Sequence, residues 1–125
     1  MNNTQKFKIS VYIPNHNYES YFKEAITSVI NQTYKNWELF LIIDGYNKKS
    51  IEIGKKFVNQ YKNKIKLIIN KKKIGLRGCA NLALKNSTGD FFTRLDADDF
   101  FVKTAFNEYI KFFKKNKKID LAYSD

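Results

Sequence analysis

The feature that most constrains the fold of this chain is a repeated alternation of short apolar runs with helix-like segments. Strand-like runs lie at residues 7–13, 37–43, 65–69 and 91–95. Helix-like segments follow at residues 20–32, 51–61 and 78–86, the first with apolar residues at spacings of three and four. A further helix is expected after Thr104, which can cap it, and a fifth strand is expected at residues 121–123.

This order of elements favours an α/β fold with a doubly wound, mostly parallel sheet that carries helices on both faces. Pro14 lacks an amide hydrogen and is expected to end the first strand. In sheets of this kind, ligands bind beyond the carboxyl ends of the strands. The loops that should converge there are residues 14–18, 44–47, 70–77 and 96–99. They define the predicted ligand site.

Composition limits the class of protein. The chain has 125 residues, 43% of them hydrophobic, which is one domain's length with enough apolar material for a core and excludes disorder for most of it. No apolar run approaches the roughly 20 residues of a membrane-spanning helix. Residues 1–8 lack the apolar stretch of a secretory signal, and a lone Cys79 cannot form an internal disulfide. We therefore expect a cytoplasmic protein in which Cys79 is a buried structural thiol.

The net charge of +11 comes mostly from lysine, because Arg77 and Arg94 are the only arginines. Lysine clusters within residues 71–73 and 114–118 could face phosphates, nucleic acid or an anionic lipid surface, or could simply be solvated. Proteins that read bases usually rely on arginine, so we expect no nucleic-acid partner. A peripheral contact with the inner face of the membrane is compatible with this charge.

Three acidic residues, Asp96, Asp98 and Asp99, crowd the end of the fourth predicted strand. Like charges at this spacing repel unless solvent or a cation offsets them. Carboxylate oxygens suit Mg²⁺ or Mn²⁺, and such ions complete their coordination with water and substrate phosphates. The alternative is an acidic turn in which Asp98 or Asp99 caps the next helix.

Other polar residues follow the other predicted strands. Asp44 and Gly45 could accept hydrogen bonds from a base or ribose, or could form an ordinary turn. His16 offers a flat ring that could stack on a base, or it could face solvent. Arg77 and the lysines at residues 71–73 could meet a diphosphate, or could be solvated.

Four segments become specific when they are taken together in this order. They are residues 9–17 (ISVYIPNHN), residues 25–34 (AITSVINQTY), residues 37–45, which begin with WEL and end with DG, and residues 89–99, which begin with GD and end with LDADD. With them the chain, from about Lys8 to its C-terminus, resembles the nucleotide-binding half of a family 2 glycosyltransferase of GT-A fold. In that resemblance LDADD contains the DxD motif of the family.

The resemblance implies a nucleotide-sugar donor, usually a UDP-sugar, and a divalent metal, Mn²⁺ or Mg²⁺. The base would lie between Pro14, His16 and Asp44, Asp96 would reach the ribose or sugar side, and Asp98 would ligate the metal. The implied nucleotide-sugar-binding residues are Pro14, Asn15, His16, Asn17, Asp44, Gly45, Arg77 and Asp96, and the implied metal ligands are Asp98 and Asp96. The metal would bridge the two phosphates and stabilise the leaving diphosphate.

Two positions depart from the family pattern. Ile43-Asp44 stands where the family has paired acidic residues, and Ala80 precedes Asn81 where an Arg is usual. Diphosphate binding therefore needs another cation. Our hypothesis is Arg77, one helical turn earlier, and an Arg77→Ala variant with unchanged nucleotide affinity would contradict it.

Residues 1–125 are expected to form one nucleotide-sugar-binding domain that lacks the acceptor-binding half of the family. That half carries the general base, so no catalytic residue is identified here and the base is expected beyond Asp125. We expect donor binding without efficient transfer to a glycan or lipid-linked acceptor, in polysaccharide biosynthesis. The alternative is a non-catalytic nucleotide-binding or dimerising module, and an uncovered sheet edge would allow a homodimer in either case.

Overall fold

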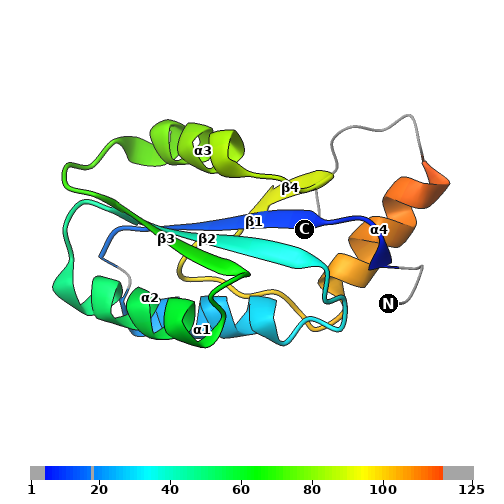
Figure 1. Cartoon of the computed structure of the whole chain (residues 1–125), viewed down its shortest axis with the longest axis horizontal. Helices are drawn as coiled ribbons and strands as arrows, with labels where there is room; N and C mark the ends of the chain where they lie inside the picture. The colour runs from blue at the N-terminus through cyan, green and yellow to red at the C-terminus, as the bar shows by residue number, and fades with distance from the viewer. Residues whose placement is uncertain (1–4, 18, 117–125) are drawn as a thin grey trace.

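The computed structural model describes residues 5–17 and 19–116. Its elements are β1 (Ile9–Asn15), α1 (Glu19–Ile30), β2 (Trp37–Asp44), α2 (Lys48–Gln60), β3 (Ile65–Asn70), α3 (Gly75–Asn86), β4 (Phe91–Arg94) and α4 (Ala105–Lys115). The four strands form one sheet in the order β3-β2-β1-β4, and every pairing is parallel (Figure 1). The α/β prediction is confirmed. The fifth strand predicted at residues 121–123 lies outside the described residues.

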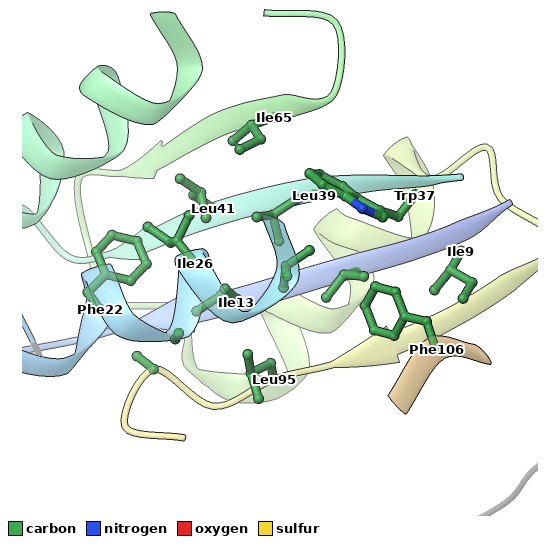
Figure 2. Close-up of a cluster of buried hydrophobic side chains, with 14 of the residues drawn as sticks. Ile9, Ile13, Phe22, Ile26, Trp37, Leu39, Leu41, Ile65, Leu95 and Phe106 are labelled. Carbon is green, nitrogen blue, oxygen red and sulfur yellow. The ribbon is translucent and has the colours of Figure 1, made fainter. Parts of the chain in front are cut away.

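Helices cover both faces of the sheet, as predicted, because β1 and β2 are buried along their whole length and supply side chains to two cores. The larger core joins one face of the sheet to α1, α2 and α4 (Figure 2). The smaller core is formed by Tyr12, Phe40, Ile42, Cys79 and Ala83. It joins the opposite face to α3, which lies alone on that side in Figure 1.

The structure corrects the expected end of the first strand. β1 continues through Pro14 to Asn15, with Pro14 opposite Ile42 in the parallel register. The backbone amide of Leu95 donates to the carbonyl oxygen of Tyr12, so the backbone groups of Tyr12 point toward β4. Pro14 lies two positions further along β1, so its backbone groups point to the same side. Since β4 ends at Arg94, the missing amide hydrogen of Pro14 breaks no hydrogen bond of the ladder.

Two helix starts and one helix cap also differ from the sequence-based expectation. α3 begins at Gly75, three residues before the predicted segment. α2 begins at Lys48, where the Asn47 side-chain oxygen accepts from the Ser50 amide at 2.9 Å. Thr104 precedes α4 as predicted, but its side chain makes no capping bond. Instead, buried Gln32 reaches from the end of α1, and its side-chain oxygen accepts from the Phe106 amide at 3.0 Å. A partner 74 positions away along the chain leaves no local signal.

The amino ends of the strands are closed by a buried acidic residue. The Glu38 carboxylate accepts hydrogen bonds from the Ser10 hydroxyl and from the amide and hydroxyl of Thr88, and it pairs with Lys8 at 3.4 Å. Gly89 passes so close that an added Cβ would lie 2.8 Å from the Lys8 carbonyl oxygen. The Gly89 and Glu38 positions of the quoted motifs thus close the fold at the end of the sheet opposite the ligand site.

Candidate functional site

The carboxyl ends of β1, β2 and β4 and the start of α3 surround a cleft of about 390 Å³. It is lined by Pro14, Asn15, His16, Asp44, Lys73, Gly75, Leu76, Asp96, Ala97 and Asp98. The four loops predicted to converge all contribute to it. A wider hollow of about 460 Å³ lies between α1 and residues 100–103, but none of the predicted site residues lines it.

Asp44 is the last residue of β2 and its carboxylate holds the start of α3 in place. One oxygen accepts from the Ile74 amide at 2.8 Å and from the Asn70 side-chain amide at 3.3 Å, and the other accepts from the Gly75 amide at 2.9 Å. Burial alone would raise the pKa of this carboxyl group. The two backbone amides, Asn70 and the Cys79 thiol outweigh burial, and the pKa lies below its usual value.

Gly75 must be glycine for the backbone to reach Asp44 in this way. Its φ of +85° lies in the left-handed region that side chains disfavour, and an added Cβ would meet no other atom within 4 Å. Cys79 is fully buried one turn further on, as predicted, and its hydrogen bond to Asp44 is an additional role. Burial, with the nearby Asp44 charge, raises the pKa of the Cys79 thiol to about 11, so it is a structural group.

His16 is held by the backbone of β2. Its Nδ1 lies 2.7 Å from the Asp44 carbonyl oxygen, an acceptor, so Nδ1 carries the hydrogen and donates. The Asn17 side-chain amide donates to Nε2 at 3.3 Å. The ring lies over Gly45, where an added Cβ would be 3.4 Å from Nδ1. His16 is therefore fixed in the cleft wall, and Gly45 makes room for it.

Asn15 is buried, with 1% of its surface exposed. Its side-chain amide donates to the Ser50 hydroxyl at 2.8 Å, which ties the end of β1 to the first turn of α2. Asn17 has a φ of +65°, which asparagine tolerates better than most residues. Neither Asn17 nor Gly45 lines the cleft directly; both support His16, which does.

Asp96 and Asp98 line the cleft from the loop after β4, whereas Lys73 lines it from the loop after β3, at the other edge of the sheet. Leu95 and Ala97 are buried and alternate with the exposed Asp96 and Asp98, both of which line the cleft. The Arg94 guanidinium lies 3.2 Å from Asp96, at a partly exposed position where such a pair contributes little to stability. Among residues 5–17 and 19–116, no hydrogen bond or ion pair is made by the Asp98 carboxylate.

Asp99 has a different role from its neighbours. Its side-chain oxygen accepts from the Phe100 amide at 2.8 Å, and its own amide donates to the Asp96 carbonyl oxygen at 3.0 Å. It forms an acidic turn, but it does not cap the next helix as the alternative proposed, because α4 begins only at Ala105 and Gln32 accepts from its Phe106 amide. Within the described part of the chain, no group of three or more His, Cys, Asp or Glu residues could hold a metal ion.

The positive charge on the cleft is Lys73. Arg77, the residue named from the sequence, is exposed on the first turn of α3 and is not among the lining residues. Lys73 would lie 3.9 Å from a Cβ added to Gly45. The signal in the sequence was its position two residues before Gly75, but three consecutive lysines gave no reason to choose one of them.

The model of the family described as Glycosyl transferase family 2 matches residues 10–123. The chain belongs to this family. It is 34% identical over 110 residues to the putative glycosyltransferase EpsE of Bacillus subtilis. The matched region covers 88% of this chain and 40% of EpsE. The chain is also 35% identical to the minor teichoic acid biosynthesis protein GgaB of the same organism, over 92% of this chain and 13% of GgaB. The chain thus spans less than half the length of these relatives.

Solved structures of glycosyltransferases share this fold. S. aureus TarS 1-349 in complex with UDP-GlcNAc superposes with a TM-score of 0.75 and 25% identity, over 88% of this chain and 32% of that one. The mannosyltransferase PcManGT of Pyrobaculum calidifontis, in complex with GDP-Man and Mn²⁺, superposes with a TM-score of 0.76 over 84% of this chain and 32% of that one. At 16% identity, this likeness shows the fold alone. Both the family and the GT-A type of fold expected from the sequence are confirmed. No helix in the described residues combines the length and apolar character needed to cross a membrane.

Proposed function

We propose that this chain binds a nucleotide-diphosphate sugar, specifically a UDP-sugar, with Mn²⁺ or Mg²⁺, as the donor half of an enzyme that transfers the sugar to a glycan or lipid-linked acceptor. The observation that carries this proposal is the charge arrangement of the cleft. Asp96 and Asp98 line it from the loop after β4, and Lys73 and the first turn of α3 line it from the segment after β3, the strand at the other edge of the sheet. A metal-bound diphosphate needs both signs of charge.

The family and the UDP-GlcNAc complex of TarS support a uridine donor. In this chain the base would lie against His16, whose ring is held by the Asp44 carbonyl oxygen. The Asp44 carboxylate has about four acceptor positions, and two backbone amides, Asn70 and Cys79 already occupy them. We therefore assign Asp44 to positioning: it fixes Gly75 and Leu76 in the cleft wall.

The carboxylates of Asp96 and Asp98 fit a Mg²⁺-type ion, which needs few protein ligands. Asp98 and Asp96 would hold the metal, with water and the two phosphates completing its coordination, since no three-residue cluster exists in the described part of the chain. When bound, the metal supplies positive charge to the leaving diphosphate. Lys73 would add a second positive charge, and the backbone at Gly75 allows close approach.

Transfer itself also requires an acceptor site and a base that takes the proton of the incoming hydroxyl group. The longer relatives have room for both outside the region that this chain matches. Our proposal for residues 1–125 alone is donor binding without efficient transfer. Losing an oriented base alone would reduce the rate about 10²–10⁴-fold.

The deciding experiment is calorimetric titration of UDP with and without Mn²⁺, with GDP as a competitor. We expect metal-dependent UDP binding that weakens about tenfold or more in Asp98→Asn, since one metal ligand loses its charge. Asp99→Asn is the matched control, because an amide oxygen can still accept from Phe100 and Asp99 does not line the cleft. If neither nucleotide binds, the donor site is contradicted and the dimerising module is favoured.

A further inference from the structure

The positive charge of this chain is concentrated in one continuous stretch. Residues 53–89 contain ten of the 23 basic residues and none of the 12 acidic residues. The rest of the chain therefore holds 13 basic and 12 acidic residues and is nearly neutral. A net charge of +11 spread evenly along the chain would suggest only solubility. A stretch with basic and no acidic residues instead indicates a positively charged surface that can bind an anionic partner.

In the fold, this stretch runs along the β3 edge of the sheet and onto both faces, because α2 and α3 lie on opposite faces. It supplies the second half of α2, the edge strand β3, the loop that follows β3, and α3. β3 pairs only with β2, so its other side is an open edge of the sheet within the described residues. Figure 1 shows the loop between β3 and α3 projecting at the same end of the molecule as the loop between β2 and α2.

This projecting end carries exposed apolar side chains among its lysines. We name it the basic tip, and it consists of Tyr46, Lys71, Lys72, Lys73, Ile74 and Leu76. Tyr46 is 71% exposed, Leu76 60% and Ile74 47%, and all three lysines are exposed. The tip is continuous, because Lys73 lies beside Gly45, the residue before Tyr46.

We propose that the basic tip docks on an anionic phospholipid bilayer. Lysines near such a surface are attracted by its negative potential, and aliphatic and tyrosine side chains can enter the boundary between headgroups and acyl chains. Nucleic acid fits this surface less well, because only one of the ten basic residues is an arginine and because three large apolar side chains lie exposed among them.

Docking in this way would bring the cleft to the bilayer. Lys73 and Leu76 belong both to the basic tip and to the cleft lining. A bound tip would therefore place the mouth of the cleft at the lipid headgroups. The acidic residues Asp96 and Asp98 also line the cleft and oppose binding in part, but the three lysines of the tip outnumber them.

The test is cosedimentation of the 125-residue chain with vesicles of phosphatidylcholine containing 30 mol% phosphatidylglycerol, or of phosphatidylcholine alone. We expect binding only to the anionic vesicles, and its loss in 0.5 M NaCl. Lys71→Ala/Lys72→Ala should weaken binding by about tenfold to thirtyfold, since each lysine near the surface contributes roughly a fivefold factor. Lys73 is left intact because it lines the cleft.

The matched control is Lys114→Ala/Lys115→Ala, which removes the same charge from α4, at the far end of the molecule in Figure 1. It should change vesicle binding less than threefold. An equal loss in both double variants would overturn the proposal in favour of net charge alone. Tighter binding to a DNA duplex than to the anionic vesicles would overturn it in favour of nucleic acid.

Insertion of the tip is tested separately with Tyr46→Trp and phospholipids brominated on their acyl chains. The native Trp37 is 3% exposed, so new quenching on vesicle addition reports on position 46. We expect quenching with anionic brominated vesicles, and its absence would overturn the proposal. Circular dichroism of each variant checks the fold. None of these measurements uses a nucleotide, so the outcome is independent of the UDP titration.

Discussion

Two acidic residues of β2 are equally buried and lie at opposite ends of the strand. Glu38 near its start and Asp44 at its end are each 4% exposed. In both carboxyl groups burial would raise the pKa, and hydrogen bonds outweigh it, so that both pKa values lie below their usual range. Chemically, the two groups are almost interchangeable.

Their partners differ, and this difference separates fold from function. Glu38 joins Ser10 of β1 to Thr88 in the connection before β4, and none of the three residues lines the cleft. Asp44 holds Ile74 and Gly75, where the cleft wall begins. A buried carboxylate at the amino ends of parallel strands stabilises the sheet, while one at the carboxyl ends also shapes the ligand site.

The largest expected effect is the loss of Glu38. Glu38→Ala leaves the buried Ser10 hydroxyl and the Thr88 amide without their acceptor, so we expect the free energy of unfolding to fall by about 3 kcal/mol. Urea unfolding measures this. The comparison predicts that UDP affinity of the folded fraction stays within about twofold. A loss of affinity as large as that in Asp98→Asn would mean that the two ends of β2 are not separate.

Asp44→Ala should have a smaller effect on stability and a larger effect on binding. The amides of Ile74 and Gly75 face the cleft and can be hydrated when the carboxylate is removed, so we expect a loss of about 2 kcal/mol in urea unfolding. Because the first turn of α3 then loses its anchor, UDP affinity should fall about tenfold. Unchanged affinity in the titration would contradict the positioning role of Asp44.

Acid should weaken both anchors. A carboxyl group whose pKa is lower in the folded state contributes stability that is present above its ordinary pKa, near 4, and is lost as pH falls through the folded value. Unfolding free energies at pH 7 and pH 3.5 should therefore differ more in the native protein than in Glu38→Gln or Asp44→Asn, which cannot titrate at those positions. Equal differences in all three proteins would contradict this.

Much of the fold could be predicted from the sequence because the apolar pattern reports burial directly. The four strands, their order along the chain and the convergence of their loops all follow from that pattern. The effect of Pro14 on β1 could not be predicted from the local sequence. It depends on where β4 ends, and β4 ends at Arg94, which pairs with Tyr12, two positions before Pro14. The capping bond of α4 also could not be predicted, because Gln32, which accepts from the Phe106 amide, lies 74 positions away in the sequence.

The candidate site could be located but not resolved into roles. Asp96 and Asp98 were identified because acidic residues crowd the end of a predicted strand and match the DxD motif of the family. The role of Asp44 was not visible, since its four hydrogen-bond donors come from the end of β3, the residue before α3 and α3 itself, and the path between them depends on the left-handed Gly75. The choice between Arg77 and Lys73 depends on the same path.

The finest comparison is therefore between these two cations. Lys73 lines the cleft with Asp96 and Asp98, while Arg77 is exposed outside the lining. Lys73→Ala should reduce UDP affinity about fivefold in the presence of Mn²⁺, since a charge-assisted contact to phosphate is lost. Arg77→Ala removes the same charge one turn into α3 and should change affinity less than twofold, because a solvated charge outside the cleft is screened. A larger loss in Arg77→Ala than in Lys73→Ala would restore the assignment made from the sequence and would require α3 to turn its first residues toward the diphosphate when the donor binds.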